Sequence, residues 1–243
     1  MVSSSYEDIA MKRRRFLNIL ITILILVSFS LTSCITTSTF ESTAEEYDYA
    51  LHYALEKANE SAITTLFFKI TQTDAFLPDS LSFIKDNANN IPGMNKLLSE
   101  WTTYMASYTM DWFEYLRSYL NELVSAMTFA SPIETVLASD DSASKAFEQA
   151  FGNEIKNTLT ENLENIDLEK WEEIVTQYRA WVETNKILFD DDNTPLEDVD
   201  IRSELASYTC NLYFSSLQVA EVLLRTTPDP NADKTVSKVF GLD

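Results

Sequence analysis

One short motif and the single histidine have residue types that could do enzyme chemistry, and each lacks a required partner. The stretch from Ser142 to Lys145 (SASK) has the S-x-x-K spacing in which a lysine activates a nucleophilic serine, but its companion S-D-N and K-T-G elements are missing. His52 is the only histidine, so a Ser-His-Asp relay, a Cys-His pair or an H-E-x-x-H zinc site is not credible. We expect Ser142 to begin a helix and His52 to be a surface or half-buried side chain.

Acidic residues offer two further possibilities, a metal site and a hydrolase site. The run from Asp190 to Asn193 suggests calcium, but Pro195 stands at the glycine position of an EF-hand loop begun at Asp190, and Ile201 at its final glutamate position. We therefore expect a solvated linker, and neither a metal nor a cofactor. A glycosidase needs two carboxylates across a cleft, and many pairs are possible among Glu161, Glu164, Glu169, Glu172 and Glu173. A cell-wall hydrolase with paired carboxylates stays an alternative.

The longest helical pattern, residues 93 to 128, is rich in aromatic side chains. Six of them recur at steps of three and four residues, so they share one face of the predicted helix. A helix that is apolar over most of its surface is normally central and buried. The same face could instead form a groove for a ligand, because aromatic side chains supply contact area and polar tips. The six candidate groove residues are Trp101, Tyr104, Tyr108, Trp112, Tyr115 and Tyr119.

The first 33 residues have the three-part pattern of a secretory signal peptide. A basic cluster, Lys12 to Arg15, precedes an apolar run from Phe16 to Leu31, and small residues follow. The run is about sixteen residues long and contains polar side chains, whereas a helix that spans a bilayer needs roughly twenty. A signal that begins at Met11 would be more compact, so Met11 is a possible true start.

The residues from Leu31 to Cys34 (LTSC) resemble the lipobox of bacterial lipoproteins. The resemblance implies that Cys34 is lipidated and becomes the first residue of the mature chain, which would anchor the protein to a membrane. Two or more acyl chains give stable anchoring where one does not. The alternatives are a short uncleaved anchor and a disulfide between Cys34 and Cys210. Because Ile35 stands where an aspartate would signal inner-membrane retention, we expect the bacterial outer membrane, with the protein facing the periplasm or the cell surface.

Composition narrows the classes of function. The net charge is −20, and the predicted leader holds four basic and two acidic residues, so the mature chain is more acidic still. Such a charge repels nucleic acids and anionic lipid headgroups. The chain has three glycines, whereas average usage would give about seventeen. Doubly wound nucleotide folds, P-loops and α/β-hydrolases need glycines at tight turns, so these families are excluded.

The remaining pattern predicts an all-α protein, a single multi-helix bundle around the long aromatic-rich helix. We expect a lipidated tether over 34–46 and a helical domain over 47–243. Serine, proline and glutamate at Ser131, Pro132 and Glu134 predict a helix with a capping box. Asp229-Pro230 should open a short helix that ends at Gly241. The other helices are expected from Tyr47 onward and near 79–88, 93–128, 141–151, 152–165, 168–188 and 200–226.

Cys210 lies within the apolar stripe of the last long helix. Ala206, Tyr213 and Leu217 repeat around it at steps of three and four, so the thiol should be packed inside the bundle. A free cysteine in that setting behaves as a small hydrophobe. The resulting expectation is an unreactive thiol.

Two stretches resemble an uncharacterised, all-helical domain-of-unknown-function family of bacterial envelope proteins. They are SAMTFASPIETVLASDDSASKAF from Ser125 and IRSELASYTCNLYFSSLQVAEVLLRTTPDPNADKTVSKVFG from Ile201. The chain departs from the family pattern at Ala75, where a glycine is usual. The resemblance implies the fold and the envelope compartment, and it supplies no activity and no site residues.

Together these features predict a lipid-anchored helical bundle of the bacterial envelope that acts by binding or assembly rather than catalysis. The expected partners are the membrane, through Cys34, and an envelope protein or a small apolar ligand, and not nucleic acid. Carriage of a small apolar ligand in a helical cavity and hydrolysis of the cell wall are the two alternatives.

Overall fold

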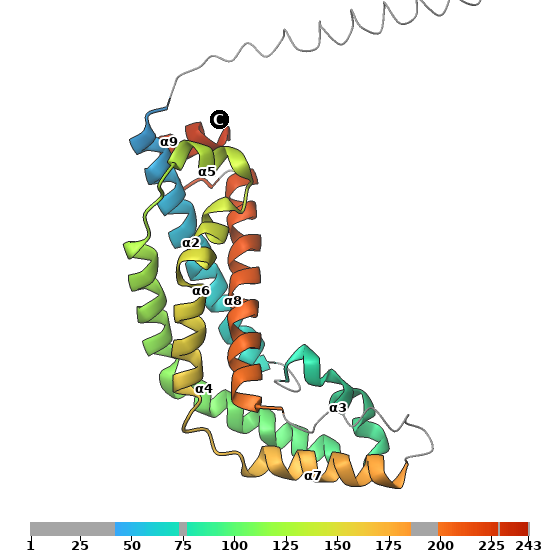
Figure 1. The fold of residues 1–243 in the computed structure, drawn as a ribbon. Helices are drawn as coiled ribbons and strands as arrows, with labels where there is room; N and C mark the ends of the chain where they lie inside the picture. The colour runs from blue at the N-terminus through green and yellow to red at the C-terminus, as the bar shows by residue number, and fades with distance from the viewer. Residues whose placement is uncertain (1–41, 73–76, 186–198, 228, 243) are drawn as a thin grey trace, which may run out of the picture. The chain divides into compact units, whose positions relative to one another are not determined.

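The computed structural model describes residues 42–72, 77–185, 199–227 and 229–242 (Figure 1). All regular elements in these residues are helices, which confirms the predicted all-α fold. The predicted signal peptide, Cys34, the acidic run from Asp190 to Asn193, and Ala75 lie outside the described residues. Five long helices and several short ones follow in the order α2 (Ala44–Gln72), η1 (Asp79–Leu81), α3 (Ser82–Asn87), η2 (Ala88–Asn90), α4 (Met94–Ala126), α5 (Pro132–Ala138), α6 (Ser142–Asn162), α7 (Glu169–Thr184), α8 (Ile201–Thr226) and α9 (Lys234–Phe240).

Helices α2 and α8 make the most extensive contact in the domain, and they run in opposite directions side by side (Figure 1). Four alanines at four-residue steps, Ala50, Ala54, Ala58 and Ala62, are fully buried on α2. Small side chains in one row let a neighbouring helix approach closely and leave room for large side chains beside them. Helix α2 also packs against α4, α5, α6 and α9, so it lies at the centre of the bundle.

A chain of hydrogen bonds runs from the buried Tyr213 and Asn59 to the exposed Asn121 and connects three helices. The Tyr213 hydroxyl of α8 donates to Asn59 Oδ1 of α2 at 2.6 Å, and Asn59 Nδ2 donates to Asn121 Oδ1 of α4 at 2.7 Å. Burial raises the pKa of Tyr213, so the hydroxyl keeps its proton and remains a donor. Because a buried polar group without a partner is costly, this chain favours one register of the three helices.

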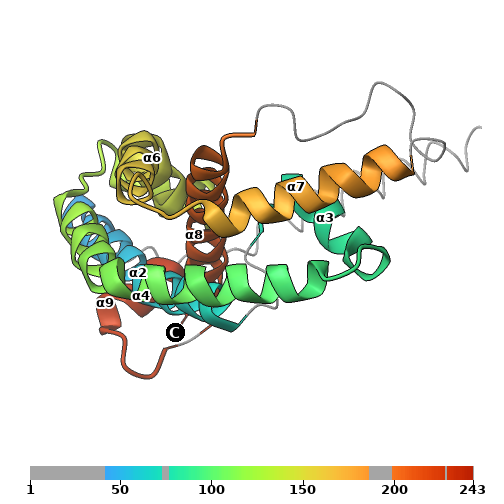
Figure 2. The ribbon, with the colours of Figure 1, turned by 90° about the horizontal axis from the view of Figure 1, so that it is seen from below.

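Helix α4 is long enough to belong to two parts of the domain. Its first half lies beside α7, and its second half runs along α2 and α6 after the helix changes direction (Figures 1 and 2). Trp101 and Trp171 pack with ring centroids 5.8 Å apart between α4 and α7. Lys170 Nζ adds a contact of 3.0 Å to Glu100 Oε2 between the same two helices.

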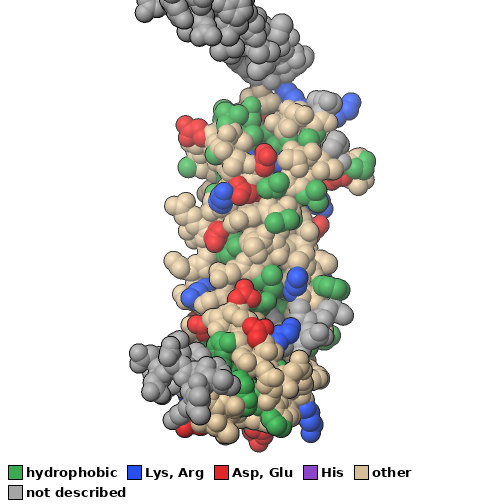
Figure 3. All heavy atoms as spheres, turned by 90° about the vertical axis from the view of Figure 1, so that its right-hand side faces the viewer, with side chains coloured by type: hydrophobic (Ala, Val, Ile, Leu, Met, Phe, Trp, Pro, Cys, Tyr) green, Lys and Arg blue, Asp and Glu red, His purple; other side chains and the backbone are tan. Residues whose placement is uncertain are grey.

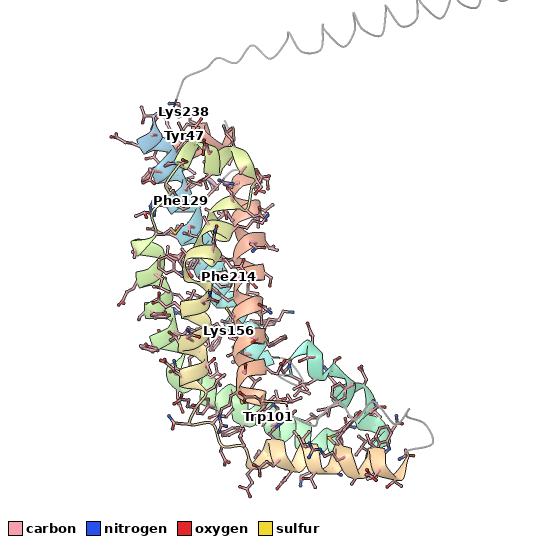
Figure 4. The ribbon with its side chains drawn as sticks, in the orientation of Figure 1. Tyr47, Trp101, Phe129, Lys156, Phe214 and Lys238 are labelled. Carbon is pink, nitrogen blue, oxygen red and sulfur yellow. The ribbon has the colours of Figure 1, made fainter. Side chains whose placement is uncertain are left out.

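Helices α5 and α9 cover the end of the bundle where α2 begins. Lys238 of α9 contacts the carboxylate of Glu46 at 3.1 Å, and Figure 4 shows Lys238 close to Tyr47. The Tyr53 hydroxyl donates to Asp229 Oδ2 at 2.8 Å. These contacts hold the C-terminal residues against the first turns of α2.

Several predicted boundaries differ from the observed ones. The two helices expected at 141–151 and 152–165 form the single helix α6. Gly152 lies inside this helix, and a Cβ added there would be in ordinary van der Waals contact with the Phe214 ring, 3.7 Å away. The short terminal helix begins at Lys234 rather than at Asp229. Asp229 instead accepts from Asn231 N at 2.8 Å in a turn, and Asp233 caps the helix by accepting from Thr235 N.

The predicted capping box before α5 is also incomplete. Ser131 stands at the N-cap and Pro132 in the first turn, as expected, but the Ser131 side chain makes no capping hydrogen bond. Instead, the Thr135 hydroxyl donates to the carbonyl of Ser131 at 3.0 Å. Helix α2 begins at Ala44, three residues before the expected start at Tyr47. The predicted helix at 79–88 is a short α-helix between two 3₁₀ turns.

Cys210 is buried between α6 and α8, as its place in the apolar stripe predicts. Its side chain is 6% exposed, and its sulfur lies 3.8 Å from the carbonyl oxygen of Gly152. Burial raises the pKa of the thiol from 9.0 to about 11. The reactive form of a cysteine is the thiolate, so the native thiol should be both inaccessible and protonated at neutral pH.

We therefore expect a thiol reagent to modify Cys210 at pH 7 only after the protein unfolds. A Phe68→Cys variant provides a control, because Phe68 is 60% exposed and a cysteine there should react at once. Because the folded pKa exceeds the unfolded one, the thiol's contribution to stability should be lost as pH rises from about 9 to about 11. Cys210→Ala should lower the free energy of unfolding by about 1 kcal/mol or less, since little volume is removed. Rapid modification of the native protein at pH 7 would contradict the prediction.

Candidate functional site

The aromatic face of α4 mainly connects α4 to its neighbours. Trp101 is fully buried and packs against Trp171. Figure 4 shows its place between α4 and α7. The Tyr104 hydroxyl accepts from the backbone N–H of Asp167 at 2.7 Å, and the Tyr108 hydroxyl donates to the carbonyl of Asn162 at 2.5 Å. Of these three residues of the candidate groove, Trp101 therefore contacts α7, Tyr104 contacts the segment before it, and Tyr108 contacts the last residue of α6.

The second half of the same face is more open. Trp112 is half-buried, and its Nε1 has no hydrogen-bond partner among the described residues. Tyr115 is 55% exposed and stacks on Tyr119, with the rings nearly parallel and their centroids 6.2 Å apart. The Tyr119 hydroxyl donates to Glu154 Oε1 at 3.0 Å and accepts from Thr158. The ligand-binding prediction now applies to the Tyr115–Tyr119 pair, the part of the face that solvent reaches most easily.

A buried ion pair lies where α5, α6, α8 and α9 meet. Glu221 and Arg225 occupy successive turns of α8, and their side chains are 0% and 2% exposed. Arg225 Nε lies 3.4 Å from Glu221 Oε1. The carboxylate of Glu221 also accepts from two backbone N–H groups at the start of α6, those of Ala143 at 3.1 Å and Ser144 at 2.6 Å. Glu221 is therefore the N-terminal cap of α6, supplied by another helix.

The guanidinium of Arg225 extends this cluster to two more elements. Its Nη1 donates to the carbonyl of Ser139 and to Ser142 Oγ, which fixes the junction of α5 and α6. Its Cζ lies 4.9 Å from the centre of the Phe240 ring of α9. Burial raises the pKa of Glu221 and lowers that of Arg225, while their mutual attraction opposes both shifts. We call Glu221, Arg225 and Phe240 the buried cluster.

The residues of the S-x-x-K stretch make structural contacts at the junction of α5 and α6. Ser142 Oγ donates to the carbonyl of Thr135 and accepts from Arg225. Lys145 Nζ lies 2.8 Å from Asp141 Oδ2 and so pairs with a carboxylate. Ser142 is the first residue of α6, as the sequence predicts, although the capping side chain comes from Glu221. Sequence reasoning missed Glu221 and Arg225, whose signal was a pair of charged residues within a mostly apolar helix.

A groove with a volume of about 690 Å³ lies on the surface beside this junction. Met127 and Phe129 contribute apolar side chains to its lining, and Glu134, Lys145 and Gln149 contribute polar ones. Figure 4 places Phe129 on the segment between α4 and α5. The groove is lined by Met127, Thr128, Phe129, Ala130, Ser131, Glu134, Thr135, Ala138, Ser139, Ser142, Lys145, Ala146, Gln149 and Ala150.

A second hollow, of about 440 Å³, lies where the segment 78–80 meets the first half of α8. Two carboxylates, Asp79 and Glu204, line it, and Ser80 Oγ donates to Glu204 Oε2 at 2.6 Å. Tyr208, whose pKa burial raises, also lines the hollow. The sequence did not indicate this arrangement, because its two acidic residues are far apart along the chain.

The remaining candidates from the sequence are on the surface. His52 is half-buried, as expected, and packs edge-to-face on Phe129 with centroids 5.2 Å apart. The five glutamates from Glu161 to Glu173 that offered carboxylate pairs are all exposed. Within the described ranges, no group of three or more potential metal ligands lies together.

The buried cluster generates a stability prediction. Glu221→Leu or Arg225→Met alone should lower the free energy of unfolding by roughly 3–5 kcal/mol, because each leaves its partner charged and buried. The double variant Glu221→Leu/Arg225→Met removes both charges and should lose much less than the two single effects added together. Chemical denaturation of the four proteins measures the coupling. A control is Lys57→Ala with Glu60→Ala, an exposed pair whose coupling should be below about 1 kcal/mol. Additive effects at Glu221 and Arg225 would refute the prediction.

Comparison with known proteins places the chain in a family. No curated protein and no solved structure matches it. Among the helices of the described residues, none combines the length and apolar character needed to cross a bilayer. The family model described as "Protein of unknown function (DUF4197)" matches residues 41–241, which span nearly all of the helical domain. The resemblance to a family of unknown function is therefore confirmed, and the chain belongs to this family.

Proposed function

We propose that this protein is a lipid-anchored component of the bacterial envelope, held through Cys34, that acts by binding rather than catalysis. The observation that carries the proposal is the LTSC sequence ending at Cys34, after a basic cluster and an apolar run too short to span a bilayer. The expected location is the outer membrane, because Ile35 rather than aspartate follows the cysteine.

The state of Cys210 supports acylation of Cys34 over a disulfide between them. Cys210 is buried between α6 and α8, and its sulfur contacts the Gly152 carbonyl. A disulfide brings the two Cα atoms to within about 7 Å, so pairing would require Cys34 to enter the packed interface of α6 and α8. Helix α2 begins at Ala44, only ten residues after Cys34, which leaves a short linker between a lipid and the domain.

The groove beside α5 and α6 supports a binding role. Its volume of about 690 Å³ is within the range of about 300–1,000 Å³ that is typical of small-molecule sites. Met127, Phe129 and four alanines offer apolar contact, and Glu134, Lys145 and Gln149 offer polar contacts that could orient a bound molecule. The ligand class that this lining suits is a small, mainly apolar molecule with one polar end.

The anchor is tested by substituting its cysteine. Cys34→Ala should abolish incorporation of a labelled fatty acid and should leave the protein soluble or trapped as an uncleaved precursor. Cys210→Ala is the matched control and should be labelled as strongly as the native sequence. Equal labelling of the Cys34→Ala variant would disprove the proposed anchor.

The groove is tested by filling it. Ala150 is an exposed alanine that lines the groove, so Ala150→Trp should block a ligand without disturbing the core. Ala180→Trp, at an exposed alanine of α7, is the matched control. We expect molecules captured by photo-crosslinking in intact cells and identified by mass spectrometry to be lost several-fold from the Ala150→Trp variant alone. Unchanged capture by Ala150→Trp would rule out the groove.

The second hollow favours one alternative, a cell-wall hydrolase. Asp79 and Glu204 line one hollow, and a glycosidase acts with two carboxylates across its substrate. Release of soluble glycan from purified cell wall by the native protein, lost in both Asp79→Asn and Glu204→Gln, would establish hydrolysis and replace the binding proposal.

A further inference from the structure

Exposed apolar side chains occur at the end of the bundle where α2 begins. Ile133 and Leu137 of α5 are 41% and 74% exposed, and Val222 and Leu223 near the end of α8 are 37% and 61% exposed. Tyr49, near the start of α2, is 48% exposed. Figure 1 shows α5, α9, the beginning of α2 and the last turns of α8 at this same end. We call these five residues the apolar end.

The length of chain between Cys34 and the domain selects which end can approach a membrane. The eight residue-to-residue steps from Cys34 to Ser42 reach at most about 28 Å when fully extended. Helix α2 has 29 residues and is therefore roughly 43 Å long. The linker is shorter than α2, so the end of the domain opposite Ser42 cannot rest on the membrane with the bundle upright. The end that carries Ser42 therefore stays near a lipid on Cys34.

We propose that the apolar end rests on the membrane surface, with Ile133 and Leu137 inserted at the lipid interface. This inference rests on the proposed lipid anchor at Cys34. Ile133 and Leu137 are four residues apart, so they lie on one face of α5. No residue of α5 is buried, yet the helix is held in place through Ser139, whose carbonyl accepts from Arg225 of the buried cluster. The buried cluster thus gives α5 a fixed position from which its apolar face contacts lipid.

The form of the apolar surface favours a lipid surface over a protein partner. Figure 3 shows one side of the molecule, on which apolar side chains are interspersed with acidic and basic ones rather than joined in one patch. A protein interface normally has a continuous buried centre. Separate apolar side chains are sufficient for contact with a bilayer, since the lipid anchor already keeps the domain at a high effective concentration there.

The charges near this end indicate the kind of lipid. Glu134, Asp140 and Asp141 are close along the chain to the apolar face of α5, and Lys145 is paired with Asp141. At the start of α2, Lys238 is paired with Glu46. The acidic excess would be repelled by anionic headgroups. The partner is therefore a neutral, zwitterionic phospholipid surface.

The test uses the full-length lipidated protein with a polarity-sensitive fluorophore on Leu137→Cys. The protein is placed in vesicles of zwitterionic phospholipid, with or without bromine on the acyl chains as a quencher. Phe68→Cys is the matched control, because Phe68 is 60% exposed and lies near the other end of α2. We expect a blue-shifted emission for the probe at position 137 and quenching by brominated lipid that is several-fold stronger than at position 68. Replacing part of the neutral lipid with anionic lipid at low salt should reduce that quenching.

Each other outcome overturns the inference in a distinguishable way. Equal, weak quenching at both positions, in protein that carries lipid and floats with the vesicles, would remove the membrane contact and leave the lipid anchor intact. A blue shift at position 137 without quenching would indicate a protein contact instead of a lipid one. Absence of lipid on Cys34 would overturn both this inference and the proposed function.

Discussion

The close packing of α8 on α2 is the contact on which the rest of the domain depends. Helix α2 carries a row of buried alanines, makes its most extensive contact with α8, and also packs against α4, α5, α6 and α9. Among the buried polar side chains of the interior, Tyr213 and Asn59 form a chain that continues to Asn121. A shift of one helix along another would break that chain and leave the buried Asn59 amide and Tyr213 hydroxyl without partners, so the polar chain selects the register that the apolar contacts stabilise.

A second constraint acts at the end of the bundle, where a buried charge replaces local capping. Helix α6 begins without a capping hydrogen bond from its own N-cap residue, Asp141. Glu221 supplies the missing acceptor from α8, and Arg225 compensates its charge and binds the carbonyl of Ser139. Burying two charges in the interior costs free energy unless their hydrogen bonds are satisfied. The same cluster fixes α5, α6 and α9 relative to α8. It therefore gives defined positions to the groove beside α5 and to the exposed face of α5.

These two constraints give the domain two regions with different roles. Close to the start of α2, the buried cluster fixes the positions of short helices, beside which lie a groove and exposed apolar side chains. Farther along α2, the first half of α4 pairs with α7 through Trp101 and Trp171, and the candidate aromatic groove is largely used for packing. A family of unknown function supplies no site to compare. The chemistry of these two regions is therefore what links the fold to a function, and it favours the proposed binding role at the end of the domain where α2 begins.

The sequence alone determined the features that depend on neighbours along the chain. Apolar spacing at three and four residues predicted the all-α fold, most helix positions and the burial of Cys210, because helical periodicity and burial of one face are local properties. The family resemblance also followed from the sequence. Tertiary structure decided what depends on distant residues: the N-terminus of α6 is capped by Glu221, which comes from α8. Likewise, the groove and the hollow of Asp79 and Glu204 exist only where separate segments meet, so no local pattern could indicate them.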